Sequence, residues 1–142
     1  MLAGKIYDTG AEDLPAKRAE AHRLCVQYNA MCETDEKKRA EILGLLLPNA
    51  EKSLYVQGPF FCDFGENINI GKNFYANFNL TLVDDTHIYV GDHTMIGPNV
   101  VIATGGHPLL PALRERGMQY NMPVRIGRNC WLGAGVIVLP GV

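Results

Sequence analysis

The sequence lacks both a surplus of positive charge and a long apolar run. Its 142 residues include 13 Lys and Arg against 15 Asp and Glu, which gives a net charge of -2. Nucleic acids and anionic membrane surfaces recruit proteins through basic surpluses, so neither is an expected partner. No apolar stretch approaches the roughly 20 residues that cross a bilayer, and the first residues lack the apolar segment of a signal peptide. We therefore expect a cytoplasmic protein.

Cysteine is sparse, and its spacing is uninformative. The four cysteines, Cys25, Cys32, Cys62 and Cys130, include no C-x-x-C pair. This spacing argues against a zinc knuckle and a dithiol redox motif, and four residues are too few for a disulfide scaffold. We expect reduced thiols. With 47% hydrophobic and 20% charged residues, the chain is not disordered, and its length suits one compact domain.

Helical periodicity is confined to the first third of the chain. Apolar and small residues interleave with charged ones from Pro15 to Met31, which predicts an amphipathic helix with a proline in its first turn. A second helix is predicted from Thr34, whose hydroxyl can cap it, to an aliphatic stripe that ends before Pro48. The two helices would form an αα-hairpin.

A six-residue repeat replaces this pattern after about residue 55. Pairs of an aliphatic residue and glycine recur at Ile70-Gly71, Val90-Gly91, Ile96-Gly97, Ile126-Gly127 and Leu132-Gly133. Leu82 and Ile88 continue the phase of Ile70 before the register slips by two residues. A hexapeptide period is typical of a parallel β-helix, in which one aliphatic side chain per short strand points into a narrow core. An antiparallel sandwich is the weaker alternative, because hairpins do not usually place such pairs six residues apart.

One segment, residues 103–123, interrupts the repeat. It contains Thr104-Gly105-Gly106-His107-Pro108. A long loop that leaves a rigid scaffold and returns to it is more often functional than accidental, so we expect the chemistry there. The chain then divides into a helical segment, 1–54, and a β-helix, 55–142.

Several segments outside the bare repeat are distinctive. They are residues 3–8 (AGKIYD), 14–18 (LPAKR), 61–65 (FCDFG), 73–79 (NFYANFN), 83–85 (VDD), 106–108 (GHP) and 126–133 (IGRNCWLG). With them the sequence resembles the maltose- and galactoside-type sugar O-acetyltransferases of the hexapeptide-repeat superfamily. The resemblance implies a mainly β protein, a left-handed parallel β-helix with an N-terminal helical hairpin. It also implies a homotrimer whose sites lie between neighbouring subunits.

The same resemblance implies a reaction. Acetyl would pass from acetyl-CoA to a hydroxyl of a maltose-, glucose- or galactoside-type sugar, and no metal would be needed. His107 would act as general base, since an imidazole with an ordinary pKa near 6.5 is a competent base at neutral pH. Asn77 would donate a hydrogen bond to the tetrahedral oxyanion. A histidine bonded to backbone and a turn-forming asparagine are the plainer interpretations of these two residues.

Binding residues follow from the resemblance in the same way. Five residues match acceptor-contacting positions, and they are Asp8, Arg18, Asp63, Tyr75 and Asp85. Trp131, Gly133 and Ala134 would lie along acetyl-CoA. The aspartates have structural alternatives as turn formers, or as a helix cap for Asp8. Trp131 would equally suit subunit packing, and Gly133 and Ala134 could be small because the coil is tight.

Histidine spacing supports a second hypothesis. His87 and His93 are one repeat step apart, so they could lie on adjacent strands and bind zinc with His107. Related β-helix trimers of the carbonic anhydrase type hold zinc between subunits, which makes a zinc-dependent hydratase the alternative activity. No wider motif accompanies this spacing.

The sequence ends at Gly141-Val142, earlier than the family pattern. Members of the family carry further coils and a C-terminal segment that contacts the CoA phosphates. We therefore expect truncated C-terminal coils and a weakened cofactor site. A truncated, inactive trimeric scaffold that binds sugar is the third hypothesis.

Overall fold

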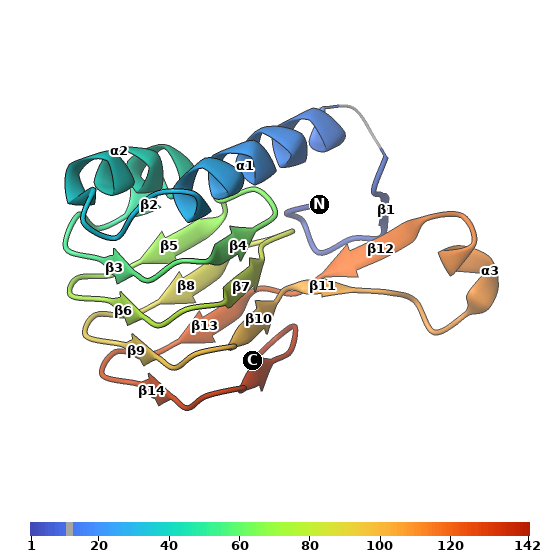
Figure 1. The fold of residues 1–142 in the computed structure, drawn as a ribbon. Helices are drawn as coiled ribbons and strands as arrows, with labels where there is room; N and C mark the ends of the chain where they lie inside the picture. The colour runs from blue at the N-terminus through green and yellow to red at the C-terminus, as the bar shows by residue number, and fades with distance from the viewer. Residues whose placement is uncertain (11–12) are drawn as a thin grey trace.

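The computed structural model describes residues 1–10 and 13–142, and it shows a triangular β-helix beneath two helices (Figure 1). Three four-stranded parallel sheets form its sides. Sheet I contains β2 (Asn49–Ala50), β5 (Ile68–Ile70), β8 (Ile88–Val90) and β13 (Val124–Ile126). Sheet II contains β3 (Tyr55–Val56), β6 (Tyr75–Ala76), β9 (Met95–Ile96) and β14 (Trp131–Leu132). Sheet III contains β4 (Phe60–Cys62), β7 (Leu80–Val83), β10 (Val101–Ala103) and β15 (Ile137–Val138).

The chain visits sheets I, II and III in turn, which confirms the parallel, left-handed β-helix predicted from the repeat and the resemblance. One coil takes 20 residues, because Ile70 is paired with Val90 and Cys62 with Leu82. Three hexapeptides would take 18. The two additional residues lie between Leu82 and Val90, at the corner from sheet III to sheet I. This corner explains the slip in the sequence register.

Aliphatic side chains fill the interior of the coil. Ile68, Ile88 and Val124 stack on successive strands of sheet I with no exposed surface. Alternate residues of these strands point outward, so the core is one column of apolar side chains. Each fully buried aliphatic side chain contributes about 1.5–3 kcal/mol relative to an exposed one.

Helices α1 (Leu14–Asn29) and α2 (Glu36–Leu46) lie over the first coil (Figure 1). Their buried residues, Leu24, Tyr28, Leu43 and Leu46 among them, join the same core cluster as the coil. Since an uncovered coil end would expose apolar cross-section and strand edges, the helices protect this end of the solenoid. β2 already pairs with β5, so the first coil includes residues before 55.

The start of α2 differs from the prediction. Its N-cap residue is Asp35, and neither Asp35 nor Thr34 makes a side-chain capping bond. The Thr34 hydroxyl instead lies 3.2 Å from Cys32 Sγ. The predicted Thr34 cap is therefore wrong. α1 ends at Asn29, two residues before the predicted Met31. The N–H of the next residue, Ala30, donates hydrogen bonds to the carbonyl oxygens of Val26 and Tyr28.

Residues 103–123 leave the coil and form a projecting segment, the excursion (Figure 1). It contains β11 (Gly105–Gly106), the short helix α3 (Pro111–Arg114) and β12 (Met118–Asn121). β12 lies between β11 and β1 (Tyr7–Asp8), and both pairings are antiparallel. The N-terminal segment therefore holds the excursion in place. Among residues 1–10 and 13–142, no helix is long and apolar enough to span a membrane.

Candidate active site

His107 lies immediately after β11 and is exposed to solvent. Its Nδ1 is 3.4 Å from the carbonyl oxygen of Met118 on β12. Met118 is also the register partner of Asp8 on β1. The three-stranded sheet thus brings His107 and Asp8, 99 positions apart in the sequence, to the same strand. Asp8 Oδ1 accepts the N–H of Gly10, so Asp8 is not the helix cap considered above.

A cluster of polar side chains connects this sheet to the coil. The hydroxyl oxygen of Tyr7 accepts hydrogen bonds from Gln119 Nε2 at 3.0 Å and Asn121 Nδ2 at 3.1 Å. Asn121 Nδ2 also donates to the backbone oxygen of Asp85 at 3.2 Å. Burial raises the pKa of Tyr7 above its ordinary value, so this phenol stays protonated at neutral pH. Neither Gln119 nor Asn121 was predicted as a site residue. The only indication in the sequence is that both lie in the segment 103–123, which interrupts the repeat.

Asp85 lies at the sheet III to sheet I corner and is 4% exposed. Its Oδ1 accepts a hydrogen bond from Arg18 Nη2 at 3.4 Å, and the Arg18 guanidinium lies 5.0 Å from the centre of the Phe64 ring. Burial raises the pKa of Asp85, and the nearby Asp63 charge adds to this, while hydrogen bonds from Gln119 and Arg18 lower it. Arg18 Nε is buried without a hydrogen-bond partner among residues 1–10 and 13–142.

Asp63 follows β4 at the same corner, one coil earlier. Its Oδ1 is 3.2 Å from His22 Nε2 on α1. Asp63 and Asp85 therefore lie on the side of the coil that α1 covers, within reach of Arg18 and His22. The structure brings Arg18, Asp63 and Asp85 together at this corner, and it places Asp8 and His107 next to Met118 of β12.

Asp84, beside Asp85, has a structural role. Its carboxylate accepts the backbone N–H groups of Asp63, Phe64 and Gly65 at 2.7–2.9 Å. Burial raises its pKa to about 6, although these three hydrogen bonds act in the opposite direction. Asp84 thereby fixes the corner backbone that carries Asp63 and positions Asp85.

Asn77 and Tyr75 lie elsewhere, on sheet II and its corner with sheet III. Asn77 Nδ2 donates to the Tyr75 hydroxyl at 3.4 Å, and Asn77 Oδ1 accepts the N–H of Phe78 at 2.8 Å. The Tyr75 ring stacks on Tyr55 with ring centres 5.7 Å apart. Within one chain, the structure therefore does not bring Asn77 or Tyr75 together with His107.

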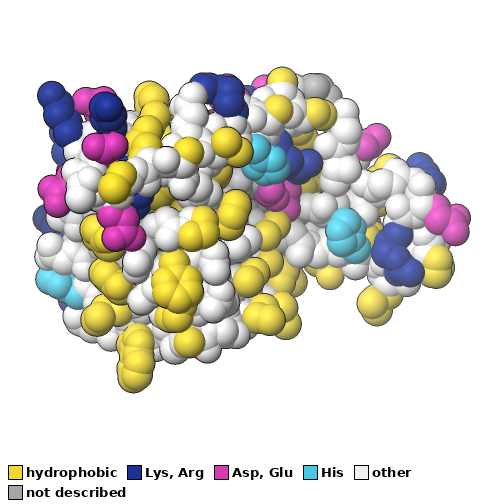
Figure 2. Space-filling view, in the orientation of Figure 1, with side chains coloured by type: hydrophobic (Ala, Val, Ile, Leu, Met, Phe, Trp, Pro, Cys, Tyr) yellow, Lys and Arg dark blue, Asp and Glu magenta, His cyan; other side chains and the backbone are white. Residues whose placement is uncertain are grey.

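Trp131 lies on the outer face of sheet II and is 80% exposed. Trp131 is the register partner of Met95, Met95 that of Tyr75, and Tyr75 that of Tyr55. The four side chains therefore form one row along the outer face of the sheet. Hydrophobic side chains gather over this side of the coil in Figure 2. Such a row is larger than the isolated apolar residues common on monomer surfaces.

Gly133 and Ala134 follow Trp131 at the next corner. At the equivalent corner one coil earlier, a Cβ added to Gly97 would lie 2.8 Å from the backbone nitrogen of Ala134. Stacking of successive corners therefore leaves no room for a side chain at Gly97.

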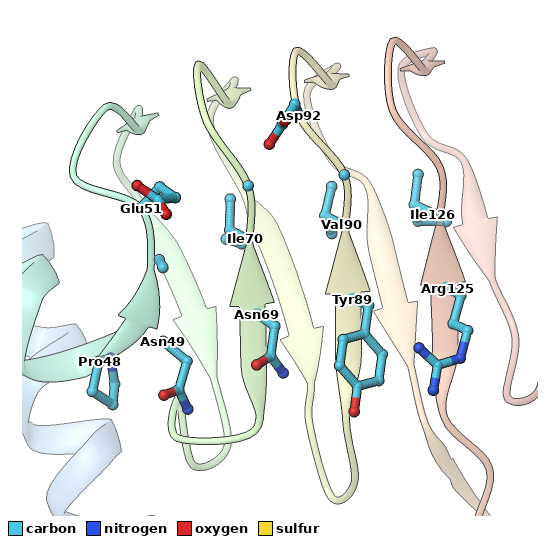
Figure 3. Close-up of a pocket in the computed structure, with 13 residues that line it drawn as sticks. Pro48, Asn49, Glu51, Asn69, Ile70, Tyr89, Val90, Asp92, Arg125 and Ile126 are labelled. Atoms are coloured by element: carbon cyan, nitrogen blue, oxygen red, sulfur yellow. The ribbon is translucent and has the colours of Figure 1, made fainter.

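A shallow groove of about 660 Å³ crosses the outer face of sheet I (Figure 3). Asn49, Asn69, Tyr89 and Arg125 form a row along it, one from each strand, and the Arg125 guanidinium lies 4.0 Å from the centre of the Tyr89 ring. No predicted site residue lines this groove.

The histidines of the zinc hypothesis are not arranged as predicted. His87 and His93 flank β8 instead of lying on adjacent strands, and the His87 ring packs against Tyr89 with centres 5.6 Å apart. His93 occupies a corner with φ of 56°. Within the described residues, no three His, Cys, Asp or Glu side chains form a group that could hold a metal ion.

Known proteins are similar to this chain in both sequence and fold. Residues 1–50 match the family model described as the maltose acetyltransferase hexapeptide capping motif. The chain is 46% identical to galactoside O-acetyltransferase of Lactococcus lactis, over 97% of this chain and 67% of the relative. It is 39% identical to galactoside O-acetyltransferase of Escherichia coli, over 100% of this chain and 70% of the relative.

Solved structures give the same result. A maltose O-acetyltransferase from Clostridium difficile superposes with a TM-score of 0.96 at 39% identity, covering 99% of this chain and 75% of that one. A galactoside acetyltransferase in complex with coenzyme A gives 0.94 at 38% identity, covering 98% and 70%. This chain belongs to the hexapeptide-repeat acetyltransferase family that includes the galactoside and maltose O-acetyltransferases.

Proposed function

We propose that this protein transfers acetyl from acetyl-CoA to a hydroxyl of a sugar of the maltose, glucose or galactoside type. The observation that carries the proposal is that β12 connects His107, Asp8 and Asp85, in a chain whose relatives are named galactoside O-acetyltransferases. A solved relative holds coenzyme A and another holds acetyl coenzyme A, which supports acetyl-CoA as the co-substrate.

His107 is the proposed general base. A hydrogen bond from Nδ1–H to the Met118 carbonyl selects the tautomer in which Nε2 carries a lone pair. Nε2 then accepts the hydroxyl proton as the sugar oxygen attacks the thioester carbonyl. Collapse of the tetrahedral intermediate breaks the C–S bond, and the proton passes from His107 to the departing CoA thiolate. Products are the acetylated sugar and CoA, and the base is regenerated.

Asp8, Arg18, Asp63 and Asp85 are the proposed acceptor contacts. Carboxylates accept charge-assisted hydrogen bonds from sugar hydroxyls. Arg18 Nε is a buried donor with no partner in the described part of the chain. Buried polar groups are normally hydrogen-bonded, so a hydroxyl oxygen of the acceptor is a suitable partner for this N–H. These residues orient the sugar, and proton transfer is left to His107.

Asn77 is the proposed donor to the oxyanion, and Tyr75 completes the acceptor contacts. Trp131, Gly133 and Ala134 are proposed to contact acetyl-CoA. All five belong to sheet II and its corner, on a different side of the coil from His107. We therefore propose a homotrimer in which His107 of one subunit faces Asn77 of its neighbour. The exposed apolar row on sheet II supports such a contact.

The division into two parts is also a proposal. Residues 1–54 would cap the acceptor site, since Asp8 and Arg18 come from this segment and contact the excursion and the corner at Asp85. Residues 55–142 would supply the rigid β-helix and His107. A cytoplasmic location is proposed because the buried Cys25 and Cys62 remain free thiols although their Sγ atoms are only 3.8 Å apart.

The activity is tested by following CoA release with acetyl-CoA and a panel of maltose, glucose and galactosides. We expect release that depends on one of these sugars. Release that is the same without any sugar, or no release with all of them, would contradict the proposal.

Mixing two inactive variants tests the trimer. His107→Ala and Asn77→Ala chains are denatured together and refolded as mixed trimers. A site between subunits predicts that some interfaces contain both native residues, so activity returns to a fraction of wild type. Each variant refolded alone is the control. No recovery in trimers shown by mass to be mixed would place both residues in one chain's site.

A further inference from the structure

A second cavity lies between α2 and the start of the coil. Its volume is about 740 Å³, within the range of pockets that hold small molecules. Leu43, Gly44 and Leu47 line one side, and Ala50 and Leu54 line the other. None of the residues assigned to acetyl transfer lines it. The wall is therefore mainly apolar, and its Tyr55 ring stacks on Tyr75 of the proposed acceptor site.

Arg39 lines the same cavity and is only 6% exposed. Its Nη2 donates to the Tyr28 hydroxyl at 2.7 Å and to the Val56 carbonyl at 3.0 Å, and its guanidinium lies 4.3 Å from the centre of the Tyr28 ring. Nε and Nη1 make no hydrogen bond to the described residues. These N–H groups are thus available to a ligand.

The charge of Arg39 is not balanced locally. Among residues 1–10 and 13–142, no carboxylate oxygen lies within 4.0 Å of its guanidinium nitrogens. Buried arginines normally pair with an anion, because a desolvated cation without a counter-ion is unfavourable. Both hydrogen-bond partners of Arg39, the Tyr28 hydroxyl and the Val56 carbonyl, are neutral. A carboxylate oxygen can accept a charge-assisted hydrogen bond from one of these free N–H groups.

The mouth of the cavity limits the charge of the ligand. Glu33, Glu36 and Lys52 line it, and Glu33 accepts a hydrogen bond from Gln57 Nε2 at 3.2 Å. Two acids and one lysine disfavour a multiply charged anion such as a phosphate monoester. A single negative charge on an apolar body matches one guanidinium behind an apolar wall.

We propose that this cavity binds a monocarboxylic acid with a compact apolar body, such as a medium-chain fatty acid. The carboxylate pairs with the free N–H groups of Arg39. The hydrocarbon lies between α2 and the first coil, against Leu43 and Leu54. This inference does not depend on the acetyl-transfer reaction.

The test uses octanoate as the probe and the full chain, with binding measured by calorimetry. Octanamide has the same apolar body without the charge and serves as the control ligand. We expect octanoate to bind at least tenfold more tightly than octanamide. Absence of octanoate binding, or equal binding of the two, would overturn the proposal.

Gly44→Leu locates the site. A Cβ at Gly44 would meet nothing within 4 Å, so a leucine enters the cavity without strain and leaves Arg39 in place. We expect octanoate affinity to fall at least tenfold while the melting temperature and CoA release stay at wild-type values. Unchanged affinity would place octanoate elsewhere and reject this cavity.

Arg39→Gln tests the charge. We expect it to abolish the preference for octanoate over octanamide, whereas Arg39→Lys keeps part of it. Should Arg39→Gln fail to fold, the pair of ligands with wild type and Gly44→Leu still decides the matter. A persistent preference in folded Arg39→Gln would contradict the proposed ion pair.

Discussion

The coil and the excursion are built in opposite ways. In the coil, the strands pair in parallel, with partners 20 residues apart before the excursion, as in Ile68 with Ile88, and 36 apart across it, as in Ile88 with Val124. In the excursion, β12 pairs with β11 and with β1, and the bond from Gln119 to Tyr7 joins residues 112 positions apart. The coil interior is aliphatic, while the contacts that hold the excursion are polar.

This difference separates stability from chemistry. A stacked aliphatic column resists change, because removing any member leaves a cavity between two neighbours. The excursion is anchored by a few hydrogen bonds and exposes His107, so its residues can change with little effect on the rest of the fold. The rigid part positions the site, and the excursion supplies the reactive group.

The largest effect is expected from His107→Ala. Loss of a general base typically lowers the rate by about 10²–10⁴-fold. The ring is exposed and has one contact, to the Met118 carbonyl, so the melting temperature should stay within a degree or two of wild type. Steady-state CoA release and calorimetry measure both. Activity within tenfold of wild type would reject His107 as the base.

Ile88→Ala tests the coil. Ile88 has no exposed surface and stacks between Ile68 and Val124, so the substitution should reduce the free energy of unfolding by about 2–5 kcal/mol. Leu109→Ala in the excursion is the matched control, because Leu109 is 96% exposed and should change stability by less than about 0.5 kcal/mol. Denaturant titration compares them. Equal losses in both variants would contradict the proposed division of roles.

Asp84→Asn tests the corner that joins the two regions. An asparagine presents an NH₂ group to backbone N–H donors, so we expect a loss of about 1–3 kcal/mol. Stability measured by chemical denaturation at neutral pH gives this value. Asp84→Ala, which also removes the acceptor, should be at least as destabilising.

The difference in stability between wild type and Asp84→Asn should change with pH in a defined direction. The pKa of Asp84 is about 6 in the folded chain against an ordinary 3.8, so the folded state holds this proton more tightly than the unfolded state. Proton binding at Asp84 therefore stabilises the folded state at pH 4. This stabilisation, at most about 3 kcal/mol of the free energy of unfolding, is lost as the pH rises through 6. Wild type should lose stability relative to Asp84→Asn between pH 4 and 7. The opposite slope would show that the three hydrogen bonds outweigh burial.

The smallest effect is expected from Tyr7→Phe. The variant leaves the amides of Gln119 and Asn121 without their shared acceptor, at a cost of about 1 kcal/mol. Faster hydrogen exchange should be confined to residues 118–121, and KM for the sugar should rise more than kcat falls. Faster exchange in the coil strands would instead show that the excursion supports the coil.

Much of the fold could be read from local patterns. The aliphatic-glycine pairs indicated a β-helix because each short strand repeats the same inward and outward alternation. The two-residue slip after Leu82 was visible, yet its meaning was not, since only the pairing registers show that it marks the corner of Asp84 and Asp85. The Thr34 cap failed because its hydroxyl is near Cys32 Sγ, a contact that propensity does not describe.

The candidate site was predictable only in part. Resemblance selected Asp8, Asp63 and His107 from distant segments, and the structure places Asp8 and His107 next to Met118. Gln119 and Asn121 were missed because amides in a loop have no distinctive spacing.

The sequence by itself determined the repeated element, the helical start and the interruption that holds His107, because these depend on side-chain periodicity along the chain. Only the tertiary structure decided which residues meet. β1 pairs with β12 across more than a hundred residues, and the three-sided coil sends Asp85 and Asn77 to different corners. Such contacts depend on the closure of long loops and on how many residues each corner holds, and no local pattern encodes either.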